Sequence, residues 1–220
     1  YLWQPGGDFV SPDGKEIVFN SDAGVEALQF WVDLVQRYKV TPLKTVDPTV
    51  MGGDFGTGNV GSMTLYPVWV AKVAKMNFDG RSAKLPKYKA EATPLGFGSA
   101  PILKGAKEKE AAWVYLDWLM RPENAIAWVK GLGNLPTRLS MRDEPAWKEY
   151  AAGQPLVGSF ADAQPSARLS YYGPGAVELT MEVAKGIEAA LYGQKTPKQA
   201  LDDAAKTAAD VLKRERAKQG

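Results

Sequence analysis

The chain has 220 residues, of which 45% are apolar and 24% are charged, and its formal net charge is +2. These values are typical of a globular protein with a sizeable core, and they exclude a disordered or fibrous chain. Basic residues are scattered among acidic ones, which argues against a surface that binds nucleic acid.

The chain contains neither cysteine nor histidine. Without cysteine it has no disulfide and no thiolate chemistry, which is compatible with an oxidising space outside the cytoplasm. Without histidine it lacks the usual general base and the commonest metal ligand, which argues against most hydrolases and metalloenzymes. No apolar run reaches the ~20 residues that span a membrane. Because the chain starts at Tyr1 without methionine, we expect a leader and an N-terminal region to precede it.

The N-terminal segment begins with turn signals and continues as a helix. Pro12-Asp13-Gly14, between apolar pairs, predicts a small hairpin or an irregular loop within residues 5–20. Apolar side chains then recur every three to four positions as far as Val35, which predicts a helix with Ser21 as its N-cap. The helical pattern is broken by Asp47, Pro48 and the pair Gly52-Gly53.

The middle of the chain predicts a mixed α/β arrangement. Short strands are expected at residues 61–65 and 96–102, with helix and loop between them. Two consecutive helices are predicted at residues 108–119 and 122–130, the second beginning at a first-turn proline. The glycines and the proline within residues 131–138 predict an extended crossing.

The last third is predicted to be mainly helical. A helix at residues 145–152 leads into a loop at 153–165, and Gly173-Pro174-Gly175 opens a long helix that ends at Gly193. Thr196-Pro197-Lys198-Gln199 combines a threonine cap, a proline at the first helical position and a glutamine three residues after the cap. This pattern predicts a capping box at the start of the final helix.

Five segments of the sequence, taken in order, resemble the periplasmic solute-binding proteins that include the maltose-binding and glycerol-phosphate-binding proteins. They are Gly6-Gly7-x-Phe9 with Asp13-Gly14-Lys15, Phe55-x-x-Gly58 with Met63, Pro67 and Trp69, Gly98-Ser99-Ala100 with Lys104-Gly105, Leu135-Pro136-Thr137-Arg138, and Gly193-Gln194-Lys195-Thr196-Pro197. Each segment alone is a weak signal, but their shared order covers nearly the whole chain. The resemblance is to the C-terminal part of the family, whose members are far longer.

The resemblance implies an α/β fold of the type II, two-lobed periplasmic-binding-protein kind, with mainly the C-terminal lobe represented. It assigns residues 1–95 to that lobe, 96–138 to a crossing segment and helices associated with the N-terminal lobe, and 139–220 to a return to the C-terminal lobe.

The function that the resemblance implies is that of a periplasmic or cell-surface receptor of an ABC importer. Such a receptor is not an enzyme and needs no cofactor. Its implied partners are a small carbohydrate, the transmembrane subunits of the permease, and the missing N-terminal lobe, in cis or as a separate chain.

Sugar binding requires flat rings for stacking and fixed hydrogen-bonding groups around them. Trp69 is the main candidate, because Pro67 shapes the turn before it and the resembled family places an aromatic residue there; filling the core is its alternative role. The other predicted ligand-binding residues are Tyr66, Tyr171, Tyr172, Gly173, Trp3, Arg138 and Asp8.

Several of these candidates keep a structural alternative. Arg138 could bind ligand or pair with a carboxylate that fixes the crossing, and Asp8 and Asp54 could hold sugar hydroxyls or satisfy turns. Gly52, Gly53, Gly56 and Gly58 lack the Lys-Ser/Thr ending of a phosphate-binding loop. Helical spacing favours a core role for Trp31, Trp113, Trp118 and Trp128.

Two other functions remain open from the sequence. A glycoside hydrolase needs only two carboxylates about 5 to 10 Å apart, although no acid pair in the sequence is conspicuous. An isolated lobe that acts as an interaction module would expose apolar surface and should associate with itself or with a partner chain.

Overall fold

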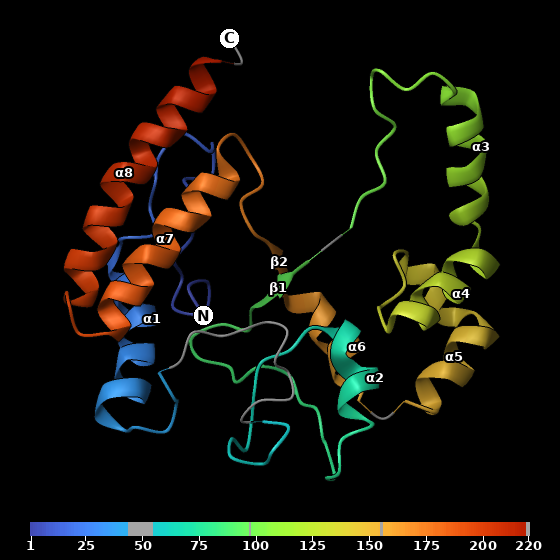
Figure 1. The fold of residues 1–220 in the computed structure, drawn as a ribbon, viewed down its shortest axis with the longest axis horizontal. Helices are drawn as coiled ribbons and strands as arrows, with labels where there is room; N and C mark the ends of the chain where they lie inside the picture. The colour runs from blue at the N-terminus through green and yellow to red at the C-terminus, as the bar shows by residue number, and fades with distance from the viewer. Residues whose placement is uncertain (44–54, 97, 155, 219–220) are drawn as a thin grey trace. The chain divides into compact units, whose positions relative to one another are not determined.

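A computed structural model describes residues 1–43, 55–96, 98–154 and 156–218 (Figure 1). The chain forms two compact units, which we name unit 1 (Tyr1–Met51, Leu85–Leu95 and Ser166–Gly220) and unit 2 (Gly52–Lys84 and Gly96–Pro165). The predicted break at residues 47–53 and the candidate Asp54 lie outside the described residues. The predicted assignment of residues 1–95, 96–138 and 139–220 to receptor lobes concerns the intact fold and stays a prediction.

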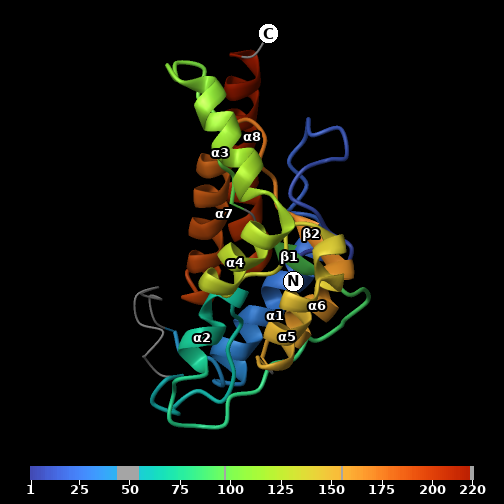
Figure 2. The same ribbon diagram turned by 90° about the vertical axis from the view of Figure 1, so that its right-hand side faces the viewer.

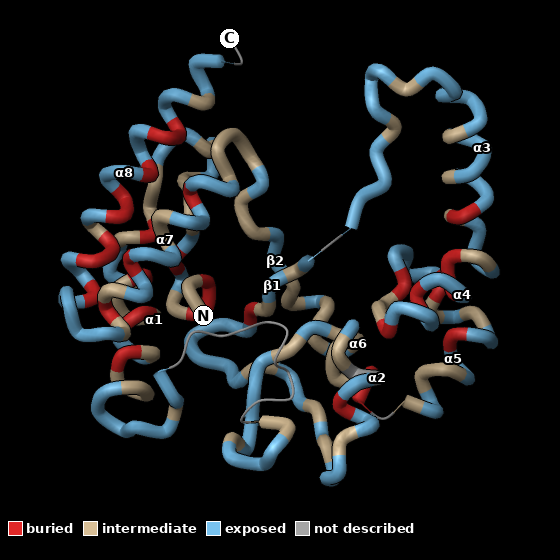
Figure 3. Tube along the Cα trace, in the orientation of Figure 1, coloured by how far each residue is buried: buried red, intermediate tan, exposed pale blue. Residues whose placement is uncertain are grey.

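Unit 1 is built around three helices that share one core. They are α1 (Asp22–Val32, continued by a π-turn at Asp33–Arg37), α7 (Ala176–Leu191) and α8 (Pro197–Ala217). α7 and α8 lie side by side (Figures 1 and 2), and buried residues follow one stripe of α8 (Figure 3). The approach is close because small residues face each other: a Cβ added at Gly186 would lie 3.0 Å from the Ala200 carbonyl oxygen and 3.1 Å from the Ala204 Cβ.

The start of α8 confirms the predicted capping box. The Gln199 N–H donates to the Thr196 hydroxyl oxygen at 3.3 Å, and the Thr196 N–H donates to the Gln199 side-chain oxygen at 3.2 Å. Both donors would otherwise be unsatisfied at a helix N-terminus, so the pair fixes the first turn.

Replacing Thr196 by alanine is expected to lower the free energy of unfolding by about 1 kcal/mol. The reason is that the Gln199 N–H loses its acceptor, and urea denaturation measures the loss. Ser21→Ala is the matched control, because Ser21 occupies the N-cap of α1 without a side-chain hydrogen bond. It should change stability by only a few tenths of a kcal/mol, and equal losses for the two variants would contradict this reading of Thr196.

The strands of the described chain belong to unit 1. β1 (Thr93–Leu95) pairs in parallel with β2 (Ala167–Leu169), so that Pro94 lies opposite Arg168. The turn predicted within residues 5–20 is confirmed as a hairpin-like loop, with an antiparallel bridge between Val10 and Ile17.

Unit 2 consists mainly of short helices. α3 (Lys109–Leu119) and α4 (Pro122–Leu132) confirm the two predicted consecutive helices, and α5 (Pro145–Ala152) has the predicted bounds. The remaining elements are a 3-10 turn at Pro67–Trp69, α2 (Val70–Val73), a 3-10 turn at Leu139–Asp143, α6 (Gly158–Ala163) and, reaching the unit boundary, a 3-10 turn at Gln164–Ser166. None of the helices in the described ranges is both long and apolar enough to cross a membrane.

Three secondary-structure predictions were wrong. Residues 61–65 are not a strand, nor are the described residues of 96–102, and the ladder forms just before the latter at Thr93–Leu95. A strand needs a neighbour to pair with, and a local apolar pattern does not supply one. The loop predicted at 153–165 contains α6, which begins at Gly158.

Candidate functional site

A tight turn in unit 2 presents the main predicted aromatic residues. Pro67 starts a 3-10 turn that leads into α2, and the Trp69 N–H donates to the Tyr66 carbonyl oxygen at 3.1 Å. Tyr66 is exposed and Trp69 is half-buried. The Lys72 Nζ lies 5.3 Å from the centroid of the Trp69 ring, in cation–π geometry. The turn therefore carries two aromatic residues three positions apart, with a cation beside one of them.

The end of α4 approaches this turn. Gly133 adopts a left-handed conformation with φ of 70° as the C-cap of α4, which a residue with a side chain rarely adopts. A Cβ at Gly133 would lie 3.4 Å from the Pro67 carbonyl oxygen and 3.7 Å from the Val68 Cα. The start of the predicted extended crossing, residues 131–138, therefore lies close to the turn at Pro67–Trp69.

Arg138 ends that segment, before the 3-10 turn at Leu139–Asp143. Its side chain is exposed, and its guanidinium makes no hydrogen bond or ion pair with another described residue. The carboxylate pairing considered from the sequence is therefore not present among the described residues, while ligand contact stays a prediction.

In unit 1, the segment Tyr171–Gly175 places one tyrosine inward and one outward. The Tyr171 hydroxyl donates to the Pro174 carbonyl oxygen at 3.1 Å, its ring packs against the core of α1, α7 and α8, and burial raises its pKa. A Cβ at Gly173 would lie 2.5 Å from the Tyr171 ring, so a larger residue there would displace the ring. Tyr172, next to this rigid turn, is exposed. Of the two tyrosines, Tyr172 is therefore the better placed to contact a ligand.

Trp3 and Asp8 lie together in unit 1 and support the fold there. The Trp3 Nε1–H donates to the Asp8 Oδ1 at 3.0 Å, and the Phe9 N–H donates to the same oxygen at 2.8 Å. Trp3 is only 6% exposed, and its ring packs edge-on against Phe9. The indole thus meets its hydrogen-bonding need inside the loop, as a buried tryptophan must. Ligand contact by these two residues stays a prediction without direct support from this geometry.

The predicted core role of three tryptophans was wrong. Trp113 and Trp118 on α3 and Trp128 on α4 are 65%, 48% and 53% exposed, whereas Trp31 is half-buried. Helical spacing shows that such residues share a face, but it does not show what covers that face.

Arg142 is a residue that the sequence analysis missed. Its Nε and Nη2 atoms are buried and have no hydrogen-bond partner in the described part of the chain. Unpaired buried donors are costly and uncommon, which makes them candidates for a functional role. The sequence offers no signal for this, because Arg142 follows the crossing in an otherwise ordinary polar segment.

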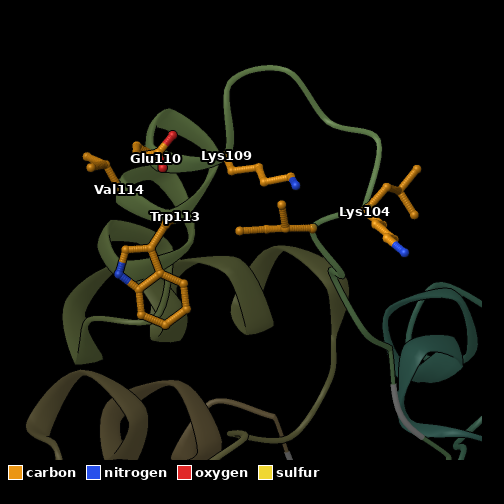
Figure 4. A pocket seen from close by; sticks show the side chains of 7 residues that line it. Lys104, Lys109, Glu110, Trp113 and Val114 are labelled. Carbon is orange, nitrogen blue, oxygen red and sulfur yellow. The ribbon is translucent and has the colours of Figure 1, made fainter.

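Two open hollows lie away from the predicted residues. One, of about 570 Å³, lies in unit 2 at the start of α3 (Figure 4), and its lining includes Trp113 and Lys109. The other, of about 770 Å³, lies in unit 1 between the loop around Lys15 and one face of α8. Neither lining includes a predicted ligand-binding residue. Within the described ranges, no cluster of acidic side chains could hold a metal ion.

Comparison with known proteins establishes the family. Residues 1–155 match the model of the bacterial extracellular solute-binding proteins. The chain belongs to this family. It spans about half the length of the curated relatives that it matches, such as a Sinorhizobium fredii protein named as a probable amino-acid ABC transporter periplasmic-binding protein. That protein is 24% identical over 90% of this chain and 45% of its own length.

Solved structures confirm the predicted α/β, type II two-lobed fold class. The cyclic alpha-maltosyl-1,6-maltose binding protein of Arthrobacter globiformis is 29% identical, with a TM-score of 0.79, over 97% of this chain and 54% of its own. Maltose-bound MalE3 of T. maritima is 26% identical, with a TM-score of 0.74, over 94% of this chain and 55% of its own. The predicted representation of mainly the C-terminal lobe stays a prediction.

Proposed function

We propose that this chain is a large part of a sugar receptor of an ABC importer, located in the periplasm or on the cell surface. The observation that carries the proposal is the similarity, at 29% identity over 97% of the chain, to a protein that binds a cyclic maltosyl-maltose. The 26% identical, maltose-bound structure supports the same class of ligand. The proposed role is reversible binding without chemistry.

Each unit, taken by itself, presents one aromatic turn as a candidate surface for a sugar ring. The turn at Tyr66 and Trp69 belongs to unit 2, and the turn at Tyr172 belongs to unit 1. Rings at rigid turns can stack on the apolar faces of sugar rings at a small cost in side-chain entropy. Arg138 supplies a hydrogen-bonding group on the same unit as Trp69.

Delivery to the permease follows from a change in population between open and closed states. A sugar that contacts both lobes stabilises the closed state only by its greater affinity for that state. We propose that residues 96–138 carry the crossing between lobes, and that the permease recognises the closed form.

Calorimetric titration of the full-length protein tests whether its ligand is a sugar. We expect heat with maltose or longer malto-oligosaccharides and with a cyclic maltosyl-maltose, because the aromatic turns match sugar rings. Single amino acids and glycerophosphocholine serve as competing ligand classes and should give no heat.

Heat with an amino acid and none with any sugar would show that the ligand is not a sugar, and would overturn the proposal. Release of new reducing ends during the titration would instead favour the glycoside-hydrolase alternative. That outcome requires two suitably spaced carboxylates.

A further inference from the structure

The hollow in unit 1 lies between two contacts that join the N-terminal loop to α8. The Asn20 side-chain amide donates to the Asp202 Oδ1 at 2.9 Å, and the Arg216 Nη1 donates to the Gly14 carbonyl oxygen at 2.7 Å. Asp202 and Arg216 both line the hollow and are fourteen positions apart on α8, so the hollow extends about 21 Å along the helix. That length matches roughly six residues of an extended peptide.

The floor of this hollow is apolar. Between the two contacts, α8 faces the loop with Ala205 and Ala209, whose methyl groups are short and leave space above them. Leu212 of α8 and Ile17 of the loop complete the apolar lining. Ala205 and Leu212 are only 7% and 2% exposed, and Ile17 packs against the core of α1, α7 and α8. The floor is therefore the outer surface of a packed core.

The rim of the hollow is basic. Lys206 and Lys213 are exposed, and neither forms an ion pair with an acidic group in the described part of the chain. They are seven positions apart, so both lie on the side of α8 that borders the hollow. Arg216 donates to a neutral carbonyl oxygen, which leaves its charge without a carboxylate partner among the described residues. Three cations therefore lack a compensating charge.

The carboxylates of the lining, Asp202 and Glu16, do not cancel this excess. Lys198, outside the lining, forms an ion pair with Asp202 at 2.5 Å, and their hydrogen bond lowers the pKa of the Asp202 carboxyl. Lys15, the fourth cation of the lining, is itself paired with Asp13 at 3.2 Å. Glu16 alone thus faces the three uncompensated cations, so the hollow keeps a net positive charge.

An elongated hollow with an apolar floor and a basic rim selects among anionic partners. A flat membrane surface does not reach a floor that lies between a loop and a helix. A chain of phosphate or sulfate groups would leave the apolar floor unused. An extended peptide alternates the direction of its side chains, so acidic side chains can meet the rim while apolar ones meet the floor.

We propose that the hollow between the N-terminal loop and α8 binds an extended acidic peptide segment of a partner protein. Carboxylates of the segment contact Lys206, Lys213 and Arg216, and its apolar side chains lie on the floor. This interaction is separate from solute binding and does not depend on the identity of the solute.

Fluorescence anisotropy of a labelled hexapeptide of alternating glutamate and leucine, titrated with the full-length protein, tests the basic rim. We expect saturable binding that weakens with added salt, because exposed charge pairs are screened. The double variant Lys206→Gln/Lys213→Gln should bind about five- to tenfold more weakly. Lys39→Gln/Lys87→Gln is the matched control, because it removes the same charge from exposed lysines of unit 1 outside the hollow. It should leave the affinity unchanged.

A second pair of variants tests the apolar floor without changing charge. Ala209→Phe places a ring in the hollow and should lower the affinity for the same peptide at least about tenfold, because the ring occupies the peptide's place. Thr207→Phe is the control, since Thr207 is an exposed position of α8 that does not line the hollow. Thermal unfolding checks that each variant is folded.

Three probes identify the chemistry of the occupant. Binding of an alternating glutamate–serine peptide or of an oligophosphate as tightly as the glutamate–leucine peptide would show a plain anion-binding surface and overturn the proposal. Equal binding of a lysine–leucine peptide, or tighter binding of anionic lipid vesicles, would overturn it too. So would the absence of glutamate–leucine binding at millimolar protein, or binding that neither the double lysine variant nor Ala209→Phe weakens.

Discussion

Replacing Gly24 by alanine is expected to lower the free energy of unfolding by about 3 kcal/mol, a large value for a change of one methyl group. Gly24 is buried in the first turn of α1, and an ideal Cβ there would lie 1.8 Å from the carbonyl oxygen of Phe19 and 2.9 Å from its carbonyl carbon. The obstruction is backbone, so no side-chain rotation relieves it. The turn that leads into α1 must move, and buried Phe19 must move with it.

Differential scanning calorimetry measures this loss. For a chain of this size, about 3 kcal/mol corresponds to a fall in Tm of roughly 6 to 12 °C. Gly131→Ala is the matched control, because Gly131 lies within α4 and a Cβ there would meet nothing within 4 Å. That variant should gain about 0.5–1 kcal/mol from the better helix propensity of alanine. A Gly24 variant as stable as the parent would show that the turn before α1 is not fixed as described.

The helices could be predicted because their signals are local. Thr196 and Gln199 determine the start of α8 from within four residues, and the first-turn proline and Gly133 mark the two ends of α4. The parallel pair of β1 and β2 joins residues more than seventy positions apart, and no local pattern indicates that pairing. The family could be recognised because it depends on the order of several weak signals along the chain rather than on any pairing.

The position of candidate rings beside turns could be predicted from the sequence, and ligand contact by these rings stays a prediction. Pro67 and Gly173 shape rigid turns, and the rings beside them, Trp69 and Tyr172, remain partly or fully exposed. Trp3 illustrates what sequence cannot show: its indole N–H is satisfied by Asp8, and the contact depends on the path of the whole loop. Trp113 shows a second limit: helical spacing places it on one face with other apolar residues, but does not show whether that face is covered.

Replacing Trp69 by alanine is expected to weaken sugar binding about 30-fold, which corresponds to roughly 2 kcal/mol. The prediction follows from the proposed function and from the rigid turn that fixes this ring. The Trp69 N–H donates to the Tyr66 carbonyl oxygen, so the turn that carries the side chain is formed before any ligand arrives. An anchor that is already in place adds affinity at little cost in entropy.

Titration of three variants by calorimetry separates ring stacking from a general disturbance. Trp69→Phe keeps a flat ring and should lose less than about tenfold in affinity, because part of the stacking surface remains. Tyr38→Ala removes an exposed ring of unit 1 outside the candidate site and should leave the affinity unchanged. Thermal unfolding checks that each variant is folded. A folded Trp69→Ala protein that binds sugar as tightly as the parent would remove Trp69 from the site and leave Tyr66 and Tyr172 as the aromatic candidates.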